Sequence, residues 1–153
     1  MVMDPDTFRD ALAHWASGVA VAAVREEQRI LATTMSAFLS VSVTPPLVLL
    51  SLGPTAQVLP FMTEGRPFGI SILSEEQSRA ASVFADSFPV GPSPFAEQGG
   101  PVIEGSLVQL ECRVRSTQSA GDHQLVFAAV ESATMAAGSP LIRYDRAYRR
   151  LAD

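Results

Sequence analysis

The chain has 153 residues, of which 47% are apolar, and a formal net charge of −5. This length fits a single domain with a sizeable core, which we expect to span residues 1–153. The eleven basic residues are all arginine and never form a run longer than two, which excludes a basic patch for nucleic acid.

Cysteine and histidine are scarce. The single cysteine, Cys112, has no partner for an internal disulfide, which is typical of a reducing compartment. His14 and His123 are the two histidines, and no ligand spacing predicts a metal site. The first fifteen residues are polar and acidic, unlike a signal peptide, and no apolar run approaches the length of a membrane span. We therefore expect a cytoplasmic protein without a membrane partner.

A helix signal opens the chain. An Asp-Pro start predicts a helix from Asp4 to Gly18, with Phe8, Leu12 and Trp15 on its apolar face. His14 lies off this face, so we expect it to be exposed.

Short strands follow the first helix. β-rich segments predict one strand at 18–24 and one or two more within 30–43. The near-continuous apolar run at 45–52 is typical of a strand buried on both faces. Residues 55–65 predict a short helix that is capped by Thr55 and disturbed by a proline, and 67–73 predict a further strand.

The second half contains the clearest patterns. A capping box of Ser74 and Gln77 predicts a helix over 74–88, with an inward face formed by Ala80, Val83 and Phe84. The Pro- and Gly-rich stretch 88–105 predicts a long loop, and such loops are often lids or binding elements.

A hairpin and a closing segment end the chain. Strict alternation at 108–115 predicts a strand, and a turn at 119–123 returns the chain through 124–135. The tail, 140–153, is either a strand or an irregular closing segment. About six strands with two or three short helices predict a mainly β fold, an antiparallel barrel whose ends are covered by helices.

One stretch is rich in small hydroxyl side chains. Thr33, Thr34, Ser36, Ser40 and Ser42 precede a double proline, and a Gly-Pro-Thr loop follows the next strand. Hydroxyls, backbone amides and helix N-termini bind phosphate without a cation, so this stretch predicts a site for a flat, phosphorylated cofactor. The alternative is that these residues serve only the strands and a helix cap.

The order of several motifs is more specific. The motifs, in chain order, are ASGVAVAAV, TTMSAFLSVSVTPPLVLLSL, FGISIL, GGPVIEGSLVQLECRV and AGDHQLVFAAV. Together they resemble the short-chain flavin reductase family, the reductase components of two-component flavin-dependent monooxygenases. The resemblance implies an FMN-binding split β-barrel that forms a homodimer. It also implies reduction of FMN or FAD by NADH or NADPH, with the reduced flavin diffusing to a separate monooxygenase.

The resemblance also implies site residues. His123 would be the catalytic residue, positioning the nicotinamide. Twelve residues would bind the flavin: Thr34, Met35, Ser36, Ala37, Ser40, Val41, Ser42, Ser51, Leu52, Gly53, Thr55 and Ser71.

The chain departs from the family pattern at two places. Ser71 stands where asparagine is usual, and Ala128 or Ala129 stands where a glycine is usual. Phe95 and Arg143 are further candidates for covering the site.

Two other functions remain open at this stage. One is another split-barrel flavoprotein, such as a pyridoxamine-phosphate-oxidase-like enzyme or an oxidase that holds its flavin tightly. The other is a non-catalytic flavin carrier or an interaction subunit of an oxygenase.

Overall fold

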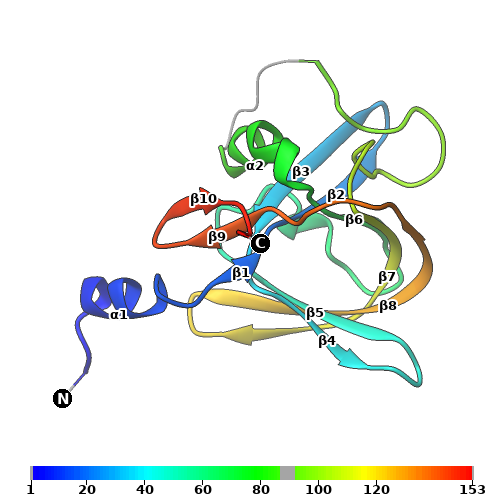
Figure 1. The fold of residues 1–153 in the computed structure, drawn as a ribbon. Coiled ribbons are helices and arrows are strands. Elements are labelled where there is room, and N and C mark those ends of the chain that lie inside the picture. The colour runs from blue at the N-terminus through cyan, green and yellow to red at the C-terminus, as the bar shows by residue number, and fades with distance from the viewer. Residues whose placement is uncertain (1, 87–91, 153) are drawn as a thin grey trace.

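The computed structural model describes residues 2–86 and 92–152 and is built on a seven-stranded antiparallel sheet (Figure 1). The strands lie in the order β3-β2-β6-β7-β8-β5-β4. Their bounds are β2 (Ala20–Glu26), β3 (Arg29–Met35), β4 (Phe38–Ser42), β5 (Leu47–Leu52), β6 (Pro67–Ile72), β7 (Val108–Ala120) and β8 (His123–Met135). In Figure 1 the sheet curls from β2 and β3 through β7 and β8 to β5 and β4. The predicted mainly β class is confirmed.

A small second sheet and short helices complete the fold. The small sheet contains β1 (Ser17–Gly18), β9 (Ile142–Tyr144) and β10 (Ala147–Arg149), with β9 in the middle. The helices are α1 (Pro5–Leu12) and α2 (Ser78–Ala85), with 3-10 turns η1 (Leu59–Phe61) and η2 (Glu75–Gln77). No helix in the described part of the chain is long and apolar enough to cross a membrane.

Two apolar clusters form the core, one on each side of β2. Because strand side chains alternate, Ala22 and Val24 face the larger cluster inside the curled sheet, with Leu50 and Phe68. Val21 and Ala23 face the smaller cluster beneath α2. β2 is therefore buried on both faces, and it fixes the position of its edge neighbour, β3.

β5 differs from its prediction. Val48, Leu50 and Leu52 are buried, whereas Leu47 and Leu49 are partly exposed, so one face of the strand is fully buried rather than both.

The first helix ends earlier than predicted. α1 stops at Leu12 because Ser17 and Gly18 pair with β9 as β1, a long-range contact that the local pattern does not reveal. α1 has no buried residue and projects away from the sheet (Figure 1). The expected exposure of His14 is confirmed.

The predicted helix at 55–65 is wrong. Only one 3-10 turn, η1, forms there, and residues 53–58 run through turns. Pro60 explains the difference, because it lies in the middle of the predicted helix and has no N–H to donate there. Thr55 therefore caps no helix, and no helix dipole acts at this loop.

The helix predicted at 74–88 is confirmed as far as Ala85, as η2 followed by α2. The capping box is present: the Ser74 N–H donates to Gln77 Oε1 at 3.0 Å. Ala81 and Phe84 form its fully buried face, whereas Ala80 is only partly buried.

The long hairpin and the C-terminal tail both form paired strands. β7 and β8 pair from Val108 to Ala120, so the first strand is longer than the predicted 108–115. The tail forms β9 and β10, which confirms the strand alternative. Of the predicted loop, 92–105 is irregular apart from a bridge between Phe95 and Ile103, and 88–91 lie outside the described residues.

Candidate functional site

The ends of β3, β5 and β8 meet at one place. β5 pairs with β8 so that Leu52 lies opposite Gln124, which places His123 beside Gly53. The Ser51 N–H donates to the Ala37 carbonyl at 3.0 Å, which holds the turn after β3 against the end of β5. Pairing between distant strands thus gathers segments that are about 90 residues apart in sequence.

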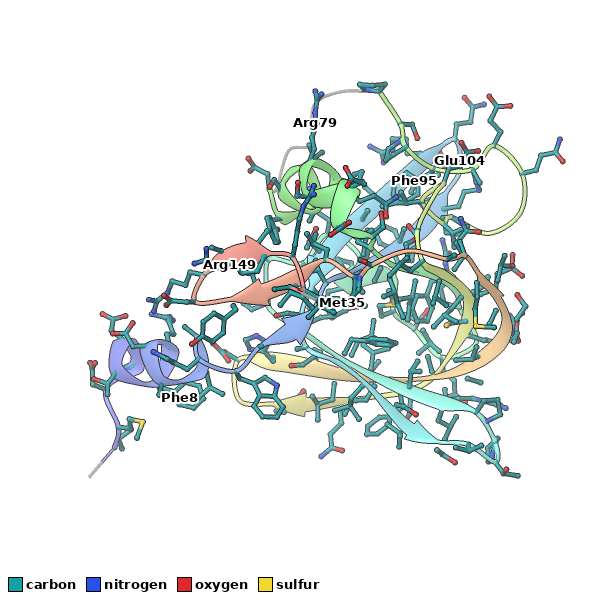
Figure 2. All side chains as sticks on the ribbon, in the orientation of Figure 1. Phe8, Met35, Arg79, Phe95, Glu104 and Arg149 are labelled. Atoms are coloured by element: carbon teal, nitrogen blue, oxygen red, sulfur yellow. The ribbon has the colours of Figure 1, made fainter. Side chains whose placement is uncertain are left out.

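Two adjoining cavities lie along β3 at this place. The first has a volume of about 210 Å³, and its lining includes Thr33, Thr34, Gly53, Thr55 and Ala85. The second has a volume of about 180 Å³, and its lining includes Thr34, Met35, Ser36, Ala85, Arg143 and Tyr148. Since Thr34 and Ala85 line both cavities, the two form neighbouring parts of one groove, which we call the β3 groove. Figure 2 shows Met35 beside the small C-terminal sheet that supplies Arg143 and Tyr148.

The two threonines of the groove differ in what their hydroxyls do. Thr34 Oγ1 donates to the Ala81 carbonyl at 2.7 Å and so ties β3 to α2. Thr33 Oγ1 is buried and has no hydrogen-bond partner within the described residues. A buried hydroxyl without a partner is costly, and a ligand that offers polar atoms would satisfy it. The phosphorylated, hydroxyl-bearing chain of a flavin fits this donor set.

His123 is held by the residue before it. Asp122 Oδ1 lies 2.7 Å from His123 Nδ1, and this hydrogen bond lowers the pKa of Asp122. The ionised carboxylate can only accept, so Nδ1–H donates to it and Nε2 is left for other partners. A Cβ atom placed on Gly53 would lie 3.4 Å from Nε2, so Nε2 faces the Gly53 end of the groove.

Most of the predicted flavin residues converge on this groove. Thr34, Met35, Ser36, Gly53 and Thr55 line it. Ala37, Ser51 and Leu52 form the adjoining turn and strand end.

Three other predicted residues lie elsewhere. Ser40, Val41 and Ser42 belong to the edge strand β4, and they line neither cavity of the groove. In this chain Ser40 and Val41 are exposed, and Ser42 is partly buried.

Ser71 also lies outside the groove. It is only 1% exposed, and its Oγ accepts the Ile103 N–H at 2.8 Å. Gln109 Nε2 donates to the Ile103 carbonyl at 2.8 Å, so both polar groups of this peptide are satisfied by side chains. The serine that replaces the usual asparagine thus fixes the 92–105 segment to β6.

We expect Ser71→Ala to lower the free energy of unfolding by about 1–3 kcal/mol, because it leaves the buried Ile103 N–H without a partner. The dissociation constant for flavin should change less than about twofold, since a structural contact is lost. Urea unfolding and flavin titration measure the two effects. A large loss of flavin affinity with unchanged stability would contradict this role.

Of the two candidates for covering the site, one is wrong. Phe95 is buried in the smaller core cluster, with its ring 5.2 Å from that of Phe84. Arg143 lines the β3 groove together with Tyr148, which the sequence prediction missed. Gln57 and Asp122 were likewise missed, whereas Thr33 was predicted only as part of the hydroxyl-rich stretch and not among the twelve flavin residues. The adjacent AGDH motif was the available signal for Asp122.

The groove offers no metal chemistry of its own. Within residues 2–86 and 92–152, no group of three or more His, Cys, Asp or Glu side chains is arranged to hold a metal ion. The polar side chains that line it carry hydroxyls, the Gln57 amide, the Asp86 carboxylate and the Arg143 guanidinium, a set suited to an organic cofactor.

Comparisons with known proteins agree with this chemistry. The sequence pattern of the flavin reductase like domain matches residues 12–152. The reductase component of 4-hydroxyphenylacetate 3-monooxygenase from Thermus thermophilus is 38% identical over 149 residues, covering 95% of this chain and 96% of the relative. An NADH-dependent flavin reductase from Rhodococcus sp is 35% identical, covering 97% and 90%. The structure of the flavin reductase PheA2 in its native state superposes with a TM-score of 0.90 at 34% identity, covering 99% of this chain and 100% of that one.

Proposed function

Because this chain belongs to the flavin reductase-like domain family, we propose that it uses NADH to reduce FMN or FAD and releases the reduced flavin to a separate monooxygenase. The family assignment confirms the resemblance on which the prediction of function rested. One observation carries the proposal: His123 Nε2 lies beside Gly53, at one end of a groove that is lined by hydroxyl side chains. The proposal includes one domain across 1–153 and a cytoplasmic location, which the unpaired Cys112 supports.

The residues of the groove would bind and orient rather than react. Thr33 Oγ1 and Thr55 would hold the ribityl phosphate, and Gly53 would lie beside the ring or the ribityl chain. The turn at Ser36 and Ala37 would support one face of the ring, and His123 would position the nicotinamide. When bound, the flavin supplies the redox chemistry, because its ring accepts a hydride.

The donor set also suits a flavin that must leave. Among the described residues that line the phosphate end of the groove, no arginine or lysine is present. Hydroxyl and amide contacts bind a phosphate less tightly than a bidentate arginine does. The phosphate therefore contributes little to affinity, which suits a reductase that releases its product to another enzyme.

We choose NADH over NADPH on two grounds. The Rhodococcus relative is named for NADH. The 2′-phosphate of NADPH needs a nearby cation. Arg143 is the one positively charged side chain among the described residues that line the two cavities, and we assign it to the flavin ring below, so no second cation is left for that phosphate.

We also propose that the chain is a homodimer. α1 buries none of its residues, and Trp15 is 77% exposed. Leu39, Val41 and Val43 are exposed on and just after β4, an edge strand. A second copy that covers these apolar side chains would remove them from water. Sedimentation equilibrium should therefore give twice the mass of one chain, and the mass of a single chain would contradict the dimer.

Measuring NADH consumption with and without added FMN tests the proposed function. We expect oxidation of NADH that depends on added flavin. A yellow protein that leaves NADH unchanged would instead support the flavin carrier. Full activity without added flavin would support an enzyme that holds its flavin tightly.

A further inference from the structure

Arg143 is a half-buried cation that forms no ion pair with any of the described residues. Its Cζ lies 5.0 Å from the centroid of the Tyr148 ring, and both side chains line the second cavity of the β3 groove with Met35 and Ser36. The ion pairs in the described part of the chain involve other arginines, and none of them includes Arg143. Partly removing a charge from water is unfavourable unless an opposite charge compensates it. An anionic ligand in this cavity would provide that charge.

The fold holds this side chain in place. Arg143 lies on β9, the middle strand of the small sheet, opposite Ser17 of β1 on one side and Tyr148 of β10 on the other. The Leu141 N–H donates to the Leu73 carbonyl at 3.1 Å, which attaches β9 to the end of β6. The pairing fixes the backbone of Arg143, and the contact with the Tyr148 ring favours one position of the guanidinium before a ligand arrives, which reduces the entropy lost on binding.

The position along the groove indicates which part of a flavin reaches Arg143. The phosphate is expected at Thr55 and Thr33, and the buried Thr33 hydroxyl has no hydrogen-bond partner among the described residues. The neighbouring cavity, which combines the aromatic ring of Tyr148 with the thioether of Met35, then receives the flat ring.

We propose that Arg143 binds the pyrimidine part of the flavin ring and favours the reduced flavin over the oxidised one. This inference rests on the proposed function. A hydride carries two electrons and one proton from C4 of the dihydronicotinamide, which becomes a pyridinium cation, to N5 of the flavin. The ring thereby gains one negative charge, shared by N1 and O2. A fixed guanidinium beside these atoms stabilises that charge as it develops.

The test compares Arg143→Gln with a matched control, Arg149→Gln, which removes an exposed arginine from β10 outside the two cavities. Dissociation constants are measured for oxidised and anaerobically reduced riboflavin and FMN. We expect Arg143→Gln to weaken binding of both reduced flavins about tenfold and of the oxidised flavins less than about threefold, as for loss of one charge-assisted hydrogen bond. Arg149→Gln should bind all four like the wild type.

Other outcomes would overturn the assignment in recognisable ways. If Arg143→Gln weakened binding of oxidised and reduced flavin equally, Arg143 would not favour the reduced ring. A loss seen with FMN but not with riboflavin would place Arg143 at the phosphate. Arg143→Lys keeps the charge and should restore part of the affinity for reduced flavin, which guards against a general folding defect. A wild-type chain that binds neither flavin would contradict the proposed function itself, whereas normal binding by Arg143→Gln contradicts this inference alone.

Discussion

Replacing His123 by alanine is expected to raise the Michaelis constant for NADH about tenfold and to lower turnover less than about threefold. The imidazole is held by Asp122 with Nε2 toward the Gly53 end of the β3 groove, a position suited to contact with the nicotinamide. The flavin carries the hydride chemistry, so this contact contributes to binding and orientation rather than to a proton transfer. Steady-state kinetics with saturating FMN measure both constants.

The second histidine provides the control. His14 is exposed, and its Nδ1 lies 3.0 Å from the Asp10 carbonyl oxygen near the end of α1, so His14→Ala should leave both constants unchanged. Asp122→Asn should raise the Michaelis constant for NADH by a smaller factor than His123→Ala, because the ring stays but loses its charged partner. A fall in turnover without a change in the Michaelis constant would contradict the positioning role of His123.

Gly69→Ala is expected to lower the free energy of unfolding by about 3 kcal/mol, the upper part of the range for an overpacked core. Gly69 lies within β6, between Ala23 and Glu111 of the adjacent strands. A Cβ atom there would overlap the Pro101 carbonyl oxygen and lie 2.9 Å from its carbonyl carbon. Backbone cannot rotate away as a side chain can, so the chain at Pro101 would have to shift away from β6.

Two measurements check the effect of Gly69→Ala. Urea unfolding gives the free energy directly. Cys112 gives a second readout, because it is 1% exposed and burial raises the pKa of its thiol to about 12, so thiol reagents should reach it only when the chain opens. Gly18→Ala is the matched control, since a Cβ atom at Gly18 meets no atom within 4 Å. Stability equal to that of the wild type would contradict the close approach at Gly69.

Local patterns predicted the elements that local physics determines. The capping box at Ser74 and the alternation along β7 could be predicted because they depend on residues near in sequence. The end of α1 could not, since it depends on pairing between β1 and β9. At 55–65, a possible cap at Thr55 favoured a helix, but Pro60 interrupts the segment and only η1 forms.

The same distinction applies to the site. The motifs indicated Gly53 and His123 separately, and only the pairing of β5 with β8 shows that they touch. Ser71 was expected to contact flavin because of its place in a motif, yet its hydroxyl oxygen accepts a hydrogen bond from the Ile103 N–H. Tyr148 carries no local signal, because its cation–π partner and the groove it lines both come from the fold.

A crystal structure of the chain soaked with FMN tests the central claim most directly. We predict density for the phosphate beside Thr33 and Thr55, with the ring passing Gly53 along β3 toward Arg143 and one face left open beside His123. Flavin bound at another surface, or a groove closed by the chain's own side chains in the presence of FMN, would contradict the account.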